Sequence, residues 1–156
     1  MFTIINSMAI LPAQVASGSE GAHLVLYDGV CGLCNHLLQF LLPRDRRAVF
    51  CFASLQSAIG RTMVARYGGN PDDLTSFHVV ADFRTSNARP IRKSDAAVFV
   101  AAQLGWPWKG LRAAAVLPVP LRDAVYDAIA RSRYRIFGRY QQCLVPSDEF
   151  RHRFVE

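Results

Sequence analysis

Two cysteines that lie three residues apart are the side chains best suited to chemistry in this sequence. Cys31 and Cys34 form a Cys-x-x-Cys that follows a short β-prone run and opens a helical pattern. At a helix N-terminus, unpaired backbone N–H groups and the positive end of the helix dipole stabilise a thiolate. A cysteine held there becomes a better nucleophile, because its pKa falls. The placement therefore predicts reversible thiol–disulfide exchange.

The spacing of the pair also suggests a division of labour. Both sulfurs can meet over the first helical turn, where a disulfide opens and closes with little backbone movement. We expect Cys31, at the loop-side and more exposed end, to be the attacking thiolate. Cys34 shares an apolar stripe with Leu37, Leu38 and Leu41, and we expect it to be the buried resolving thiol.

An acidic residue precedes the pair. Asp28 stands three residues before Cys31, within an Asp-Gly dipeptide that is typical of a turn. Its carboxylate is also placed to accept the proton of the buried thiol as that thiol becomes a nucleophile. The two roles are compatible, so Asp28 joins Cys31 and Cys34 as a candidate catalytic residue.

Metal binding is the main alternative to redox chemistry. Zinc sites usually combine two such pairs, or one pair with spaced histidines, and this sequence has no second Cys-x-x-Cys and no His-x₃₋₅-His. The alternative is a binding module in which Cys31, Cys34 and also Cys143 hold a soft metal ion such as zinc or copper. Cys51 lies in an apolar run, where we expect a small buried hydrophobe. The redox hypothesis needs no bound cofactor, only an external thiol donor such as glutathione or a reductase.

The periodicity of apolar residues predicts an α/β domain around this motif. The expected order is strand, helix, strand, helix, hairpin and helix. The expected strands are 24–27, 48–53, 77–81 and 89–92, and the last should lie at an edge because Pro90 cannot donate to a ladder. The first half then forms a parallel βαβ unit, and an antiparallel hairpin closes the sheet. A third helix over 95–104 would be capped by Ser94.

The ends of the chain differ from this central pattern. Residues 1–22 have no helical or strand period, and we expect a flexible leader. This segment lacks the positively charged start of a secretory signal, which favours a cytoplasmic protein. Residues 23–156 should form one domain, with a helical appendage from about residue 105 that has helices over 109–117 and 121–133.

Composition narrows the class of protein. The chain has 156 residues, of which 51% are hydrophobic and 19% charged, which excludes intrinsic disorder and predicts a soluble globular domain. The longest apolar runs are too short to span a membrane. The net charge of +6 is spread along the chain, so nucleic acid is not the expected partner. One acid-free cluster is either an anion-binding groove or a solvated helix end; it contains Arg131, Arg133, Arg135 and Arg139.

The motif resembles that of a known family. Residues 27–34, Tyr-Asp-Gly-Val-Cys-Gly-Leu-Cys, are similar to the signature of the DCC family, which is named for its Asp-Cys-Cys set and described as thiol–disulfide oxidoreductases. The similarity continues in 54–57, 92–97 and 134–139, then in Cys143 and Pro146, and so covers about residues 23–146. It implies a thioredoxin-like three-layer fold of order β-α-β-α-β-β-α with a C-terminal helical extension.

The same resemblance suggests where a substrate binds. Thioredoxins carry a cis-proline immediately before the third strand, but here Thr75 and Ser76 precede Phe77, so substrate docking should differ. In glutaredoxins the start of the third helix lies near the Cys pair. We therefore expect Ser94 and Asp95 to bind the polar end of a thiol substrate such as glutathione. Alternatively, Ser94 serves only as a helix cap.

Overall fold

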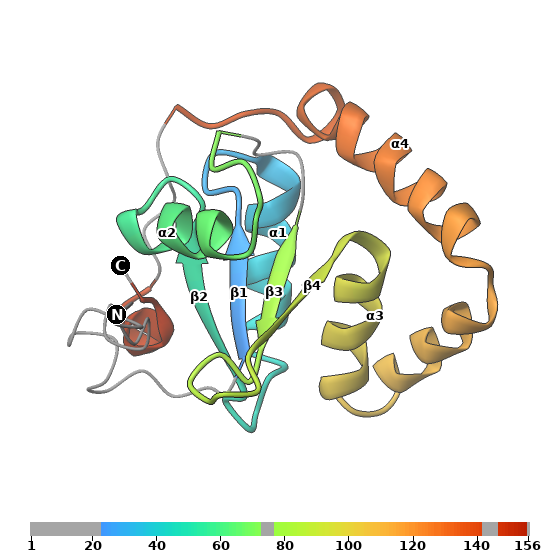
Figure 1. Ribbon diagram of the computed structural model, residues 1–156, viewed down its shortest axis with the longest axis horizontal. Helices are drawn as coiled ribbons and strands as arrows, with labels where there is room; N and C mark the ends of the chain where they lie inside the picture. Colours follow the sequence, from blue (N-terminus) through green and yellow to red (C-terminus); the bar gives the residue numbers. More distant parts are fainter. Residues whose placement is uncertain (1–22, 73–76, 142–146, 156) are drawn as a thin grey trace, which may run out of the picture.

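The structure is a computed structural model that describes residues 23–72, 77–141 and 147–155 (Figure 1). The order of elements that the sequence predicts around the Cys pair is confirmed. The strands are β1 His23–Tyr27, β2 Phe50–Ser54, β3 His78–Ala81 and β4 Arg89–Arg92. The α-helices are α1 Gly32–Leu41, α2 Ala58–Arg66, α3 Lys93–Gln103 and α4 Val119–Phe137. The described residues also form the 3-10 helices η2 Trp108–Val116 and η3 Asp148–Arg153.

The four strands form one mixed sheet in the order β2-β1-β3-β4. β1 pairs with β2 in parallel, and β3 is antiparallel to both β1 and β4. This is the predicted βαβ unit closed by a hairpin. Pro90 lies in β4 at the edge of the sheet, as expected, because proline has no N–H to give to a second neighbour. The architecture is consistent with the thioredoxin-like fold that the resemblance implies.

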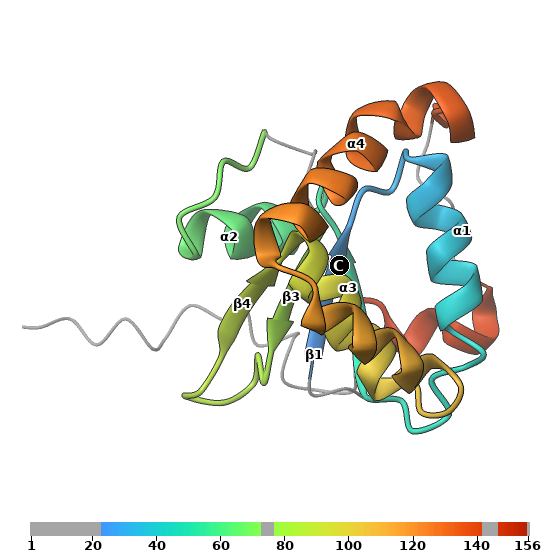
Figure 2. The same ribbon diagram turned by 90° about the vertical axis from the view of Figure 1, so that its right-hand side faces the viewer.

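Successive residues of the strands point to opposite faces of the sheet and pack in two separate hydrophobic cores. Leu24 and Leu26 of β1 pack in the core that includes α2 residues. Val25 and Tyr27 pack in the other core, with residues from α1 and α3. Figure 2 shows α1 and α2 on opposite sides of the sheet. Because all of β2 is buried, its continuous apolar run fits a parallel strand covered on both faces.

The starts of two helices are capped differently. Ser57 caps α2, and its side chain accepts the N–H of Gly60. The prediction that Ser94 caps the third helix is wrong, since α3 begins at Lys93 and its N-cap is Arg92. Lys93 adopts a positive φ of 51°, which turns the chain from β4 straight into the helix and leaves no room for a separate cap.

The C-terminal third of the domain is helical, as predicted. The first expected helix is a 3-10 helix, η2, and the second is the long helix α4. Pro120 is accommodated in the first turn of α4, where a backbone N–H has no helical partner. None of the helices in the described part of the chain is long and apolar enough to cross a membrane. The expected leader, residues 1–22, and Cys143 lie outside the described residues.

α4 returns the chain to the Cys pair. In Figures 1 and 2 it runs from the region of α3 to the N-terminal end of α1. Gly138 and Tyr140, just beyond its last residue, form backbone hydrogen bonds with Gly32 and Val30 at the start of α1. The appendage therefore forms part of the surroundings of the Cys-x-x-Cys.

Candidate active site

Cys31 is the N-cap of α1, as its position in the sequence predicts. β1 ends at Tyr27, and the turn that follows is closed when the Cys31 N–H donates to the carbonyl of Asp28 over 3.2 Å. The Cys31 backbone is extended (φ −84°, ψ 123°), and its Sγ accepts the N–H of Cys34 at 3.5 Å. The Cys31 sulfur is thus held at the N-terminus of α1 by a contact within the first helical turn.

The expectation that Cys31 is the more exposed cysteine is wrong. Its relative exposure is 0%, whereas Cys34 is only partly buried. The cover comes from the end of α4. Gly32 donates its N–H to the carbonyl of Gly138 at 3.1 Å, and Tyr140 donates its N–H to the carbonyl of Val30 at 2.8 Å. A segment more than a hundred residues away in the chain thus lies over the start of α1.

Cys34 faces an apolar pocket with the rest of its stripe. The stripe residues Leu37, Leu38 and Leu41 line the same pocket, so this helix face borders a cavity where the sequence suggested core packing alone. Burial, chiefly, together with the neighbouring Cys31 raises the pKa of Cys34 to about 12. Cys34 is therefore held as a neutral thiol near pH 7.

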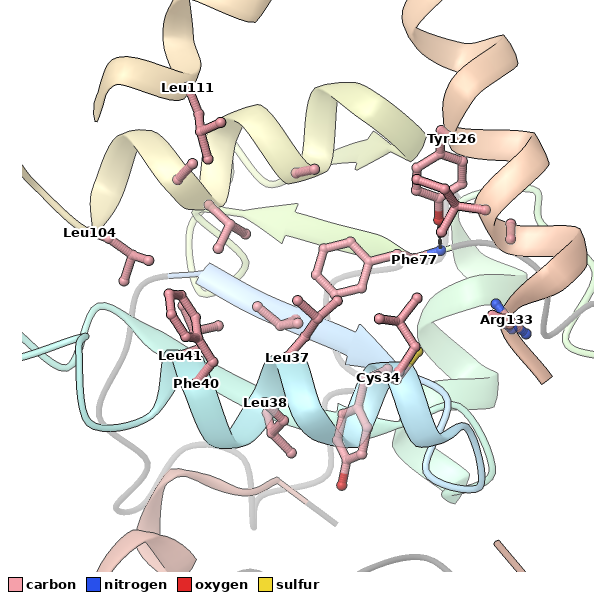
Figure 3. A pocket seen from close by; sticks show the side chains of 18 of the residues that line it. Cys34, Leu37, Leu38, Phe40, Leu41, Phe77, Leu104, Leu111, Tyr126 and Arg133 are labelled. Carbon is pink, nitrogen blue, oxygen red and sulfur yellow. Dashed lines mark hydrogen bonds between the residues drawn. The ribbon is translucent and has the colours of Figure 1, made fainter. Parts of the chain in front are cut away.

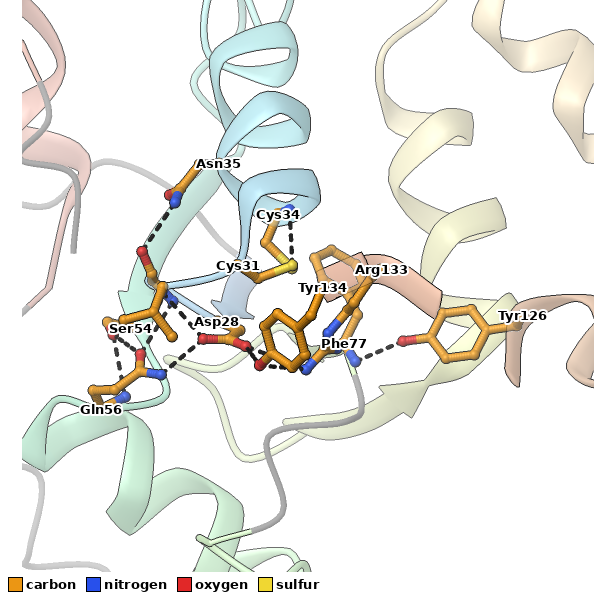
Figure 4. A network of polar contacts seen from close by, with 12 residues as sticks. Asp28, Cys31, Cys34, Asn35, Ser54, Gln56, Phe77, Tyr126, Arg133 and Tyr134 are labelled. Atoms are coloured by element: carbon orange, nitrogen blue, oxygen red, sulfur yellow. Dashed lines mark hydrogen bonds and ion pairs between the residues drawn. The ribbon is translucent and has the colours of Figure 1, made fainter. Parts of the chain in front are cut away.

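Asp28 lies at the centre of a polar network beside the pair (Figure 4). One carboxylate oxygen accepts from the Gln56 side chain at 2.8 Å and from the Val30 N–H at 3.2 Å, which makes the predicted turn. The other accepts from Arg133 at 3.2 Å and from the Tyr134 hydroxyl. The side chains of Asp28 and Arg133 are 1% and 5% exposed. This buried ion pair joins α4 to the end of β1.

Two polar side chains at the start of α3, Ser94 and Asp95, also contact α4. Ser94 donates its hydroxyl hydrogen to Asp123 at 2.5 Å. Asp95 pairs with Arg122 at 2.9 Å. A substrate that bound Ser94 and Asp95 would compete with both contacts. Binding of glutathione at this helix start stays a prediction.

A further contact from α4 lies near the position where thioredoxins carry the cis-proline. The Tyr126 hydroxyl accepts the N–H of Phe77 at 2.7 Å, just before β3. Thr75 and Ser76, which precede Phe77, lie outside the described residues. A tyrosine that the sequence pattern did not single out therefore lies at this strand end.

The other two cysteines of the chain are Cys51 and Cys143. Cys51 is fully buried in β2, and burial raises its pKa to about 12, as expected for a small buried hydrophobe. Cys143, the third ligand of the metal alternative, lies outside the described residues. Among the residues that the structure describes, no group of three or more His, Cys, Asp and Glu side chains could hold a metal ion.

Arg133, Tyr134 and Gln56 are site residues that the sequence analysis did not assign. Arg133 belongs to the basic cluster for which a solvated helix end was one interpretation, and that interpretation is wrong for this residue, which is 4% exposed. Arg131, Arg135 and Arg139 are exposed. Tyr134 and Gln56 lie within two of the segments that carry the family resemblance, and that was the available signal.

The geometry agrees with what related sequences show. Residues 25–139 match the family model described as DCC1-like thiol-disulfide oxidoreductase. The chain belongs to the DCC1-like family. The matched range includes β1 from Val25 onward, the Cys pair and all of α4, and it ends one residue before Tyr140.

Two curated proteins support membership of the DCC1-like family. The uncharacterized protein YuxK of Bacillus subtilis (strain 168) is 36% identical over 132 residues, covering 85% of this chain and 93% of that protein. A DCC family protein of Arabidopsis thaliana, described as chloroplastic, is 34% identical over 121 residues, covering 77% of this chain and 67% of that protein. No solved structure matches the chain.

Proposed function

We propose that this DCC1-like protein is an enzyme that exchanges disulfides through the Cys31–Cys34 dithiol, with Cys31 as nucleophile and Cys34 as resolving thiol. The observation that carries the proposal is the position of the Cys31 sulfur at the N-terminus of α1, where it accepts the Cys34 N–H. The family model supports a thiol redox role in general. A cytoplasmic location is part of the same proposal.

The difference between the two thiols supports these roles. Since the raised pKa of Cys34 keeps it protonated, Cys31 is the sulfur placed to act first as a thiolate. It attacks one sulfur of a substrate disulfide R–S–S–R′, forms Cys31–S–S–R and releases R′S⁻, which takes up a proton. Cys34 then loses its proton and attacks the Cys31 sulfur, which forms the Cys31–Cys34 disulfide and releases RS⁻. Two electrons have passed from the protein to the substrate.

Asp28 serves this cycle chiefly as a positioning residue in our proposal. Its carboxylate holds Arg133 and Tyr134, and through them the end of α4, against the Cys pair. The proposed acceptance of the Cys34 proton by Asp28 would use one of the oxygens that now receive these hydrogen bonds. Asp28 can therefore couple resolution of the mixed disulfide to release of α4.

Access to Cys31 requires movement of its cover. Two backbone hydrogen bonds, Gly32 to Gly138 and Tyr140 to Val30, hold the end of α4 over the pair. Neither bond involves a reacting atom, so the end of α4 can withdraw without disturbing the sulfurs. We infer that attack by Cys31 on a disulfide follows such a withdrawal.

Trapping of the mixed disulfide tests the roles. Cys34→Ser should accumulate a covalent adduct at Cys31 with a small disulfide, because the resolving thiol is gone. Cys31→Ser should accumulate little adduct, because the remaining Cys34 thiol is protonated near pH 7. Intact-protein and peptide mass spectrometry measure both, with Cys51→Ser as the matched control. A stable adduct on Cys34 and none on Cys31 would reverse the assignment.

A further inference from the structure

A pocket of about 450 Å³ lies beside Cys34, between α1, α3, η2 and α4 (Figure 3). That volume is in the range of small-molecule sites, roughly 300–1,000 Å³. Its walls are almost wholly aliphatic and aromatic. A surface of this kind gains free energy when it contacts an apolar ligand in place of water.

The pocket has two different ends. Cys34, Tyr126 and Arg133 lie at one end in Figure 3, and Leu104 and Leu111 lie towards the other. The Cys34 sulfur is thus at the polar end of an otherwise apolar cavity. A ligand with a sulfur at one end and a hydrocarbon group behind it matches this arrangement.

The far end of the pocket is bounded by rings. Phe40 of α1 and Trp108 of η2 both line it, and their rings meet edge to face with centroids 4.8 Å apart. Edge-to-face pairs of this kind are favourable and fix the relative position of the two elements. The pair limits how long a ligand the pocket accepts.

The charges around the pocket argue against a charged ligand. Arg133 is the one charged residue among those that line it, and it forms a buried ion pair with Asp28. An ionised group brought into the apolar walls would lose its hydration without gaining an opposite charge. The substrates that fit are therefore uncharged, and they differ from glutathione, which carries several charged groups.

We propose that this pocket binds the hydrocarbon group of a small, uncharged organic disulfide, with the disulfide at the Cys34 end. The proposal rests on the exchange function proposed above and names its substrate class. In the step, R–S–S–R takes two electrons from the Cys31–Cys34 dithiol. The substrate S–S bond breaks, the protein S–S bond forms, and the two thiol protons end on two molecules of R–SH. A small dithiol reductant then restores the protein.

Mixed disulfides of pyridine-2-thiol test the proposal, because their exchange releases a coloured thione. With ethyl, butyl and hexyl groups, the concentration for half-maximal single-turnover rate should fall about four-fold per added methylene until the pocket is full. The glutathione mixed disulfide should be a poorer substrate than the hexyl one. Rates that are independent of chain length, or faster with glutathione, would overturn the proposal.

A substitution that fills the pocket provides the matched comparison. Ala97 lines the pocket and is exposed, so Ala97→Phe should remove the advantage of the longer chains without a large loss of stability. Ala65→Phe places the same ring on an exposed position of α2, away from the pocket, and should leave the chain-length dependence unchanged. Equal effects of the two variants would contradict the proposed site.

A binding measurement separates this inference from the exchange function. The Cys31→Ser, Cys34→Ser double variant cannot exchange disulfides, but calorimetry should show that it binds alkyl methyl sulfides more tightly as the chain lengthens. Such binding without any exchange activity in the wild type would retain the pocket and reject the enzyme. Exchange activity without such binding would retain the exchange function and reject the pocket as its substrate site. Binding that appears only after residues 1–22 are removed would overturn the proposal and make that segment the occupant.

Discussion

At the scale of single residues, Cys31 and Cys34 are distinguished by their surroundings. Cys31 caps α1 and has no exposed surface. Cys34 borders a pocket, and the pKa of its thiol is strongly raised. The sequence predicted the motif and its place at a helix start, because both are local properties. It could not predict which sulfur is exposed, because the cover over Cys31 comes from residues near 138, far along the chain.

The pKa of Cys34 should depend on Cys31. Burial is the larger cause of its elevation and the neighbouring Cys31 is the next. Replacing Cys31 by Ser should therefore lower the pKa of Cys34 from about 12 while burial keeps it above the ordinary value of 9.0. The pH dependence of alkylation, mapped to each cysteine by mass spectrometry, measures the change.

Cys51 is the internal control for this titration. Its pKa is raised to about 12 by burial, and the causes of that shift do not include Cys31. It should keep the same pH profile in the variant and the wild type. An unchanged profile at Cys34 would show that Cys31 does not influence its neighbour, and would contradict the proposed division of roles.

At the scale of elements, the end of α4 acts as a cover over the start of α1. Gly32 makes the close approach possible, because a Cβ at this position would lie 2.0 Å from the carbonyl oxygen of Phe137. Any larger residue must push the backbone of α4 away. The glycine inside the Cys-x-x-Cys is thus explained by a contact with a helix that ends more than a hundred residues later.

Gly32→Ala should expose Cys31. Loss of the two backbone hydrogen bonds that hold the cover would cost about 1–3 kcal/mol, which corresponds to a roughly 5- to 150-fold rise in the alkylation rate of Cys31. Gly110→Ala is the matched control, because a Cβ there meets nothing within 4 Å. Timed iodoacetamide labelling provides the rates. A Gly32→Ala protein that is as slow as the control would show that α4 does not limit access.

Local sequence patterns predicted some features of the elements, but not the contacts between residues far apart in the chain. The parallel βαβ unit, the closing hairpin and the edge position of β4 followed from apolar periodicity and turn chemistry. The ion pair of Asp28 with Arg133 joins residues 105 positions apart, so no local pattern predicts it. Leu37, on the predicted apolar stripe, is half exposed because it borders the pocket.

At the scale of the whole molecule, His23 links the stability of the sheet to pH. It opens β1, its Nδ1 accepts the N–H of Asp82 at 3.1 Å, and its ring contacts Phe99 with centroids 5.0 Å apart. Burial lowers its pKa below 6.5, and the nearby carboxylates of Asp82 and Asp45 oppose this in part. The folded protein therefore binds the proton less readily than the unfolded chain.

The contribution of His23 should be complete above the unfolded pKa of about 6.5 and be lost as the pH falls below it. Each unit by which the pKa is lowered corresponds to about 1.4 kcal/mol of unfolding free energy. Denaturant unfolding at pH 7 and pH 5 should show a larger loss for the wild type than for His23→Phe. His36→Gln, at an exposed position of α1, should behave like the wild type. Identical losses in all three proteins would rule out His23 as the group responsible.

The proposed function depends on a reversible disulfide between Cys31 and Cys34, and a redox titration tests for this disulfide most directly. The metal-free protein is equilibrated with dithiol buffers of graded potential, alkylated, and analysed by peptide mass. We expect the Cys31–Cys34 linked peptide to appear in a single two-electron transition, within the range of roughly −270 to −120 mV spanned by thioredoxin-like proteins. If the Cys31–Cys34 disulfide does not form at any potential, or if the two thiols change their reactivity only when zinc or copper is bound, the proposed function is contradicted.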